Sequence, residues 1–258
     1  MKTLFIGDTH LKNSLILPLV DDILAQYHIE RIIFMGDYVD LNGQDTNTRL
    51  YAKDLIYLLE WKQERQKAGI EVVNLIGNHD MSYYLGSPIT SNYLKDQEAF
   101  EAIGDFLEDL DLQIAFQLDE YLVSHAGFNR IFDVEPWHFE RLSLEYEAEL
   151  LRFASVVGPM RGGKDFGGSP IWADYREMEL IYNKAYPKQI VGHTPQQSID
   201  LSKNNIIGVD TFAVDEEFNF YGNGDLLLYD DLDKTFTVVP TEWKNVRILD
   251  KLKTHLKK

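Results

Sequence analysis

With 258 residues, 45% of them hydrophobic, the chain can bury a sizeable core as one large domain or two small ones, which excludes an intrinsically disordered protein. Its 25 basic and 42 acidic residues give a net charge of −17, which argues against strong non-specific binding to nucleic acid and against binding to membrane surfaces. Cysteine is absent, which excludes disulfide bonds and thiolate zinc sites, and no apolar run reaches the ~18 residues of a membrane-spanning helix, so we expect a cytoplasmic protein.

Short apolar runs that end in a polar cluster, usually led by glycine, recur along the chain and are typical of buried strands. Between several of them, apolar residues recur at helical spacing over residues 14–28, 46–68 and 96–110. This alternation predicts an α/β fold. The five runs, each with its cluster, are TLFI and GDTH (3–10), RIIFM and GDYVD (31–40), VVNLI and GNHD (72–80), EYLVS and HAG (120–127), and KQIV and GHTP (188–195).

The later part of the chain follows a different pattern. NNIIGVD, GDLLLYD and KTFTVVP are strand-like with little helix between them, so we expect antiparallel strands that form a second sheet packed on the first. Residues 129–170, which hold a helical stretch (about 137–155) and the segment GPMRGGKDFGGSP, are interpreted as an insertion or lid within a single domain of residues 1–243. Residues 244–258 form a basic tail, interpreted as a solvated terminal helix.

Polar clusters that follow strands of an α/β sheet converge at one edge, where such folds bind ligands. Crowded carboxylates repel one another unless cations neutralise them, and a mixed Asp, Asn and His set suits Mn²⁺, Fe²⁺ or Zn²⁺ better than Ca²⁺. Because one ion needs only three or four protein ligands, the larger set predicts two ions that share a bridging carboxylate. The side chains are those of Asp8, His10, Asp37, Asp40, Asn78, His79, Asp80, His125 and His193.

The blocks GDTH, GDYVD, GNHD, HAG and GHTP, in that order, resemble the calcineurin-like metallophosphoesterases, and most of all their phosphoprotein phosphatase and diadenosine-tetraphosphatase branch. The later segment GVDTFAV…GDLLLYD resembles the closing part of that branch, so the likeness extends over about residues 4–240. It implies two mixed β-sheets that form a sandwich flanked by α-helices, and two divalent cations, of which we expect Mn²⁺ first and Fe²⁺, Zn²⁺ or Mg²⁺ as alternatives.

The resemblance also implies a role for each matching residue. Asp8 and His10 hold the first metal, and Asp37 bridges both. Asn78, His125 and His193 hold the second. His79 is the general acid, oriented by Asp40, and a metal-bound hydroxide attacks phosphorus in line. Asp80 is interpreted as structural or as a partner of a ligand, Trp172 as a core residue, and His28, His138 and His255 as surface or packing residues.

The phosphate-binding arginines of that branch are not matched. Leu41 and Ile76 occupy two of their positions, and Asp174 occupies a third. Because arginine gives planar, bidentate recognition of phosphate, other groups must bind the substrate here. We expect Arg176 first and Arg161 second, with Arg49, Arg130 and Asn42 as further candidates.

Three functions remain open from the sequence. The first is hydrolysis of a phosphomonoester, such as a phosphoprotein. The second, favoured by the missing arginines, is hydrolysis of a diester or nucleotide: a dinucleoside polyphosphate, a cyclic nucleotide or a nucleic-acid end. The third is a non-catalytic scaffold, which the complete set of ligands and the retained His79 disfavour. The expected partner is a phosphorylated substrate, and no oligomeric state is indicated.

Overall fold

The computed structural model describes residues 1–202 and 205–256, which form two mixed β-sheets packed face to face. The five-stranded sheet has the order β3 (Glu71–Asn74), β2 (Arg31–Phe34), β1 (Lys2–Ile6), β8 (Leu226–Asp230) and β9 (Thr235–Val239). The four-stranded sheet has the order β4 (Ala115–Leu118), β5 (Tyr121–Ser124), β6 (Gln189–Val191) and β7 (Ile206–Gly208). The predicted fold class, α/β with two mixed sheets flanked by helices, is confirmed.

The strands that precede the five polar clusters run parallel within each sheet. β1 pairs in parallel with β2, and β2 with β3, while β5, β6 and β7 form a second parallel set. Their carboxyl ends therefore point the same way within each sheet. This arrangement brings the loops that follow these strands together.

One expectation about the late strands was wrong. β8 and β9 are antiparallel, as expected, but they extend the first sheet, because β8 pairs with β1. β7, from the NNIIGVD run, instead joins the second sheet in parallel with β6. Asn204 of that run lies outside the described residues. Alternating apolar and polar residues indicate that a segment is a strand, but they do not indicate which strand it pairs with.

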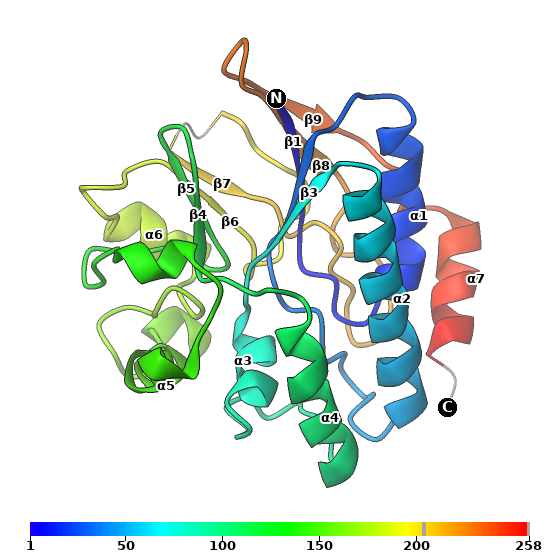
Figure 1. The fold of residues 1–258 in the computed structure, drawn as a ribbon, viewed down its shortest axis with the longest axis horizontal. Coiled ribbons are helices and arrows are strands. Elements are labelled where there is room, and N and C mark those ends of the chain that lie inside the picture. The colour runs from blue at the N-terminus through cyan, green and yellow to red at the C-terminus, as the bar shows by residue number, and fades with distance from the viewer. Residues whose placement is uncertain (203–204, 257–258) are drawn as a thin grey trace.

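Alternation along β1 shows how the core divides. Phe5 faces the second sheet and packs in the layer between the sheets with Ile33 and Ile190. Leu4 and Ile6 face the opposite way, toward the helix-covered side. Figure 1 shows α1 (Asn13–Leu24), α2 (Thr48–Lys67) and α7 (Val246–His255) together on one side of the molecule, and α5 (Glu147–Ser155) and α6 (Tyr175–Leu180) on the other, beside the four-stranded sheet.

The three predicted helices are present with shorter bounds. α2 begins where Asn47 accepts a hydrogen bond from the N–H of Leu50, and α4 (Gln97–Glu108) begins where Asp96 accepts one from Ala99. The stretch expected at 137–155 is divided into two 3₁₀ turns, Pro136–Phe139 and Leu144–Tyr146, followed by α5. A further helix, α3 (Asn78–Tyr84), starts directly at the GNHD cluster.

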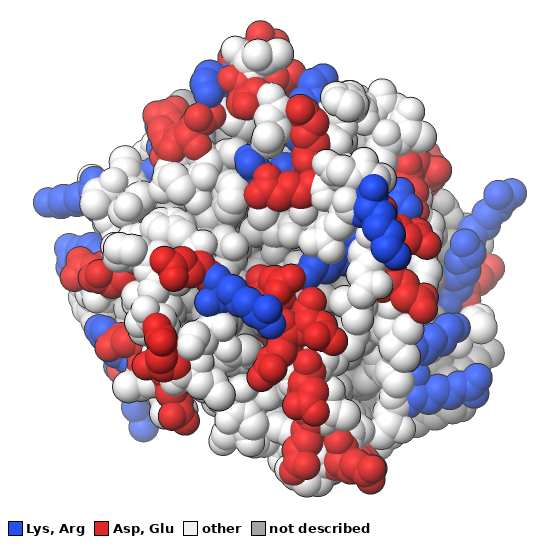
Figure 2. Space-filling model, in the orientation of Figure 1, with Lys and Arg blue, Asp and Glu red and all other residues white. Residues whose placement is uncertain are grey.

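The tail does contain a helix, α7, but one face of it is packed rather than solvated. Ile248, Leu252 and Leu256 are buried, and the helix lies against α1. Among the helices of the described ranges, none is long and apolar enough to cross a membrane. Acidic side chains are spread over the surface, as Figure 2 shows for one face. A single domain of residues 1–243 with a lid at 129–170 stays a prediction.

Candidate metal centre and active site

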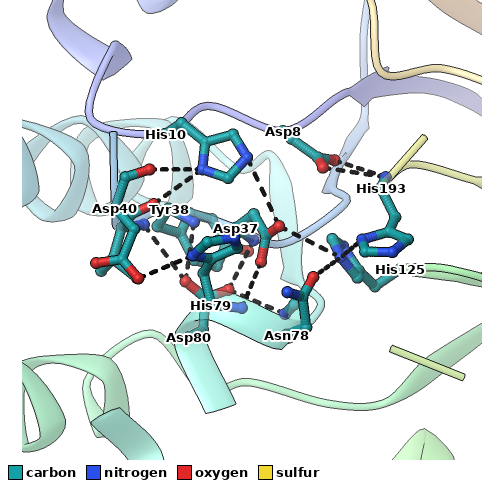
Figure 3. Close-up of polar contacts among 12 residues, drawn as sticks. Asp8, His10, Asp37, Tyr38, Asp40, Asn78, His79, Asp80, His125 and His193 are labelled. Atoms are coloured by element: carbon teal, nitrogen blue, oxygen red, sulfur yellow. Dashed lines mark hydrogen bonds and ion pairs between the residues drawn. The ribbon is translucent and has the colours of Figure 1, made fainter. Parts of the chain in front are cut away.

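The loops after β1, β2, β3, β5 and β6 meet at one place, as predicted (Figure 3). Within the described part of the chain, two groups of side chains could each hold a metal ion, with ligand atoms that lie within 4.8 Å of one another. One group is Asp8, His10 and Asp37, and the other is Asp37, His125 and His193. Asp37 belongs to both groups, which is the position expected of a bridging carboxylate.

Four residues of the site have a backbone conformation that non-glycine residues rarely adopt. His10, Asp37, Asp40 and His193 have φ values of 43°, 53°, 56° and 60°, in the left-handed region. Such conformations cost free energy unless neighbouring groups fix them. The carboxylate of Asp80 fixes the loop after β2, because it accepts hydrogen bonds from the N–H groups of Asp37 (2.7 Å) and Tyr38 (2.9 Å) as well as Gly77 (2.9 Å). This contact fits the structural interpretation of Asp80.

Two of the glycines that precede the ligands are required by close approach. A Cβ atom on Gly77 would collide with the side chain of Asp37, and one on Gly192 would collide with the carboxylate of Asp8. The glycines therefore let the loops approach closely enough for the ligands of different strands to meet.

The imidazoles are oriented for metal binding. Nδ1 of His125 donates to the carbonyl oxygen of Met35 (2.7 Å), and Nδ1 of His10 donates to that of Asp40 (2.8 Å). The Nε2 lone pairs of both rings therefore point inward. They face Asp37 Oδ2 at 3.5 Å from His125 and 3.6 Å from His10.

Further acceptors face the same space. Oδ1 of Asn78 lies 3.2 Å from Nε2 of His125. Nδ1 of His193 lies 3.1 Å from the same Nε2. Acceptors that face one another without a proton between them repel, and a cation removes that repulsion. The donor set therefore fits divalent metal ions.

Burial sets the protonation of these ligands. It lowers the pKa of His125 to about 3 and holds the pKa values of His10 and His193 well below the usual range, so all three rings are neutral, the form that binds metals. Burial also raises the pKa of Asp37 to about 7 and that of Asp8 well above its usual value. Without a nearby positive charge, these two buried carboxylates resist ionisation. A bound cation would stabilise their ionised form.

His79 and Asp40 form a separate pair beside the ligands. Nδ1 of His79 donates to Oδ2 of Asp40 (2.8 Å), which leaves Nε2 of the ring free. The hydroxyl groups of Tyr51 (2.7 Å) and Tyr83 both donate to the other oxygen of Asp40. Burial lowers the pKa of His79, but Asp37 and the hydrogen bond to Asp40 outweigh it and raise the pKa to about 9.

A pocket of about 300 Å³ opens onto the site. Six of the eight predicted catalytic and metal-binding residues line it: His10, Asp37, Asp40, Asn78, His79 and His193. Asp8 and His125 lie behind this lining but within the ligand groups. Leu41, Asn42 and Trp172 also form part of the wall, and the Trp172 ring stands edge-on to His193 at 5.9 Å, so the tryptophan borders the pocket rather than lying wholly in the core.

The two predicted substrate-binding arginines are placed differently. Arg161 lines the pocket, and its Nη2 donates to the carbonyl oxygen of His193 (2.8 Å) and to Thr194 Oγ1 (2.9 Å). Arg176 is not among the lining residues; its side chain is 63% exposed and forms a bidentate pair with Asp174 (2.7 and 3.1 Å). Of the other candidates, Arg49 lines a different cavity and Arg130 lies over the ring of Phe166 at 5.1 Å.

Sequence reasoning missed four residues. Tyr51 and Tyr83 hold Asp40, as described. Lys12 is 1% exposed, lines the pocket, and its ammonium contacts the carbonyl oxygen of His10 at 3.4 Å. Asp210 also lines the pocket, and its Oδ1 has no hydrogen-bond partner in the described residues. Asp210 could have been identified from the sequence, because the segment IIGVD repeats the pattern of an apolar strand followed by an acidic residue.

Comparison with solved structures places the fold among the phosphatases. A cold-active protein-tyrosine phosphatase of a psychrophilic Shewanella species aligns with a TM-score of 0.55 at 18% identity, over 92% of this chain and 80% of that one. A protein serine/threonine phosphatase from Saccharomyces cerevisiae aligns with a TM-score of 0.52 at 16% identity, over 94% of this chain and 80% of that one. At these identities the likeness shows the fold alone. No significant match was found among curated proteins.

The family comparison is more specific than these structural matches. The family model described as calcineurin-like phosphoesterase matches residues 1–229, which include all five polar clusters and all the candidate ligands. The resemblance seen in the sequence is thereby confirmed. The chain belongs to the calcineurin-like phosphoesterases, metal-dependent hydrolases that act on phosphoester bonds.

Proposed function

We propose that this protein is a dinuclear metal-dependent phosphoesterase that hydrolyses a phosphomonoester. The observation that supports this most is the sharing of Asp37 between two groups of ligands. Asp8, His10 and Asp37 would hold one ion, and Asp37, Asn78, His125 and His193 the other. The ligands are nitrogen and oxygen atoms, a set that suits Mn²⁺ and Fe²⁺ or Zn²⁺.

When bound, two such ions supply a nucleophile at neutral pH and neutralise charge that develops on the phosphoryl group. The chain itself supplies the proton. Because Nδ1 of His79 is bonded to Asp40, its Nε2 is the atom that would donate a proton to the leaving oxygen. A positioned general acid contributes about 10²–10⁴-fold to the rate.

Arg161 is our candidate for binding the phosphoryl group. Both Arg161 and Arg176 pair with Asp174, but of the four arginines considered it is Arg161 that lines the pocket. Lys12 adds a second cation in the same wall. Two cations beside a metal pair favour a dianionic monoester over a monoanionic diester.

One observation favours a diester or a nucleotide instead. Leu41 and Trp172 give the pocket an apolar wall, which would accommodate a second ester substituent or a base. A direct comparison of p-nitrophenyl phosphate with bis(p-nitrophenyl) phosphate separates the two functions. We expect the monoester to have the higher kcat/KM, and the reverse order would establish the alternative.

The test of the proposal itself uses purified protein loaded with Mn²⁺. We expect hydrolysis of p-nitrophenyl phosphate, a large loss in Asp37→Ala, and unchanged activity in His28→Ala, a histidine on the surface. Metal content is measured on every sample. Wild-type protein that binds two ions but releases no p-nitrophenol from either ester would refute catalysis and favour a binding scaffold.

A further inference from the structure

A second cavity, larger than the catalytic pocket, lies where three helices meet. It has a volume of about 860 Å³, is open to solvent, and is bordered by the first turns of α1 and α2 and the last turns of α7. It shares no lining residue with the catalytic pocket. In Figure 1 this region is at the lower right, between the lower ends of α2 and α7.

The cavity is basic in a strongly acidic protein. Arg49, Lys53 and Lys251 line it, and Asp250 is the one acid among its lining residues. In the described chain, none of the three cations has a carboxylate within 4.0 Å, whereas Arg31, Arg65, Arg141, Arg152, Lys188 and Lys234 are all paired with acids. Figure 2 shows Lys and Arg side chains gathered along this edge of the molecule with little acid between them.

The start of α2 adds uncompensated donors. This helix has 20 residues and no acidic side chain in its first turn. Asn47 satisfies the N–H of Leu50, but the N–H groups of Thr48 and Arg49, which also line the cavity, donate to no group of the described residues. The positive end of a long helix and three unpaired cations therefore surround one space.

We infer that this cavity binds a small polyanion that carries at least two phosphate groups, such as a diphosphate or a nucleoside polyphosphate. The lining cations come from two helices, Arg49 and Lys53 from α2 and Lys251 from α7, and the volume of about 860 Å³ accommodates a ligand larger than a single phosphate. His255 also lines the cavity, and its Nε2 donates to the carbonyl oxygen of Leu11 (2.7 Å). The ligand would thus lie beside a residue that contacts the loop carrying His10.

The test measures binding of methylenediphosphonate, which cannot be hydrolysed, to the Mn²⁺-loaded protein by equilibrium dialysis at fixed free Mn²⁺. The catalytic metals can also bind this probe, so the stoichiometry is compared between variants. Lys53→Gln/Lys251→Gln removes two cations of the cavity. The control Lys67→Gln/Lys253→Gln makes the same charge change on the same two helices but outside the cavity.

We expect the wild type and the control variant to bind one more molecule per chain than Lys53→Gln/Lys251→Gln. Equal stoichiometry in all three proteins would overturn the inference. Acetylation of lysines, followed by mass spectrometry of the wild type, gives a second readout that does not depend on variants. Methylenediphosphonate should slow acetylation of Lys53 and Lys251 but not of Lys67 and Lys253, and equal protection of all four would also refute the site.

Discussion

Nδ1 of His79 lies 2.8 Å from Oδ2 of Asp40, so the imidazole is held in one orientation with Nε2 toward the pocket. The same carboxylate receives two tyrosine hydroxyl groups on its other oxygen. Asp40 therefore cannot rotate without breaking those bonds. The proposed proton donor is thus held through Asp40 by two buried hydroxyl groups, those of Tyr51 and Tyr83, which do not line the pocket.

The first prediction concerns this support. Asp40→Asn should lower kcat by about 10²-fold for an alkyl phosphate, whose leaving group needs a proton, but much less for p-nitrophenyl phosphate. Tyr51→Phe and Tyr83→Phe should each cost about fivefold with the alkyl ester, because each removes one hydrogen bond. Tyr38→Phe, which loses a bond to the carbonyl oxygen of Leu75, is the matched control. Equal losses with both esters would mean that these residues are only structural.

The second prediction concerns the shared carboxylate. Asp37→Asn should lose both metal ions, because both groups of ligands include Asp37, whereas His193→Ala should lose mainly one. Metal content per chain, measured by plasma mass spectrometry after dialysis, checks this. Asp105→Asn, on the exposed side of α4, is the control. Retention of two ions by Asp37→Asn would show that Asp37 does not bridge them.

The third prediction is that metal-free protein loses stability as the pH rises from about 6.5 to about 8. The folded-state pKa of His79 is raised from 6.5 to about 9, so its protonated form stabilises the fold and that contribution is lost as the pH rises between these values. The pKa of Asp37 is raised from 3.8 to about 7, so its contribution is lost between those two values and is gone above pH 7. His125, whose pKa is lowered to about 3, has the opposite effect below the window, and Lys12, whose pKa is lowered to about 8, has it above pH 8. Urea unfolding of EDTA-treated protein at several pH values tests this. Added Mn²⁺ should restore most stability at pH 8, where Asp37 is ionised.

The fourth prediction compares the two arginines that contact Asp174. Arg161→Ala should lower kcat/KM for the monoester by roughly 10–100-fold, the loss expected for one charge-assisted hydrogen bond, mainly through KM. Arg176→Ala should change it by less than about threefold, because its side chain is exposed and outside the pocket. Steady-state kinetics with metal content held equal decides between them. A larger effect at Arg176 would support the order expected from the sequence.

The candidate ligands could be chosen from the sequence because each stands in a recognisable local pattern. Asp8, Asn78 and His193 each directly follow a glycine at the end of an apolar run, and parallel strands bring such ends together. Tyr51 and Tyr83 could not be predicted, because they lie 11 and 43 residues from Asp40 and reach it only through the packing of α2 and α3. That Arg161 lines the pocket and Arg176 does not could not be predicted for a similar reason, since it depends on how the Gly-rich segment folds back toward His193.

The position of β1 has a consequence for how the molecule is made. β1 is the first strand of the chain and the central strand of its sheet, between β2 and β8, where Lys2 is aligned with Asp230. Asp8 and His10, directly after β1, are synthesised early, but the strand that completes their sheet emerges more than 200 residues later. At ~5–20 residues per second this interval is on the order of ten seconds or longer. During it, the first acidic loops exist without the framework that holds them, so metal capture should follow synthesis rather than accompany it.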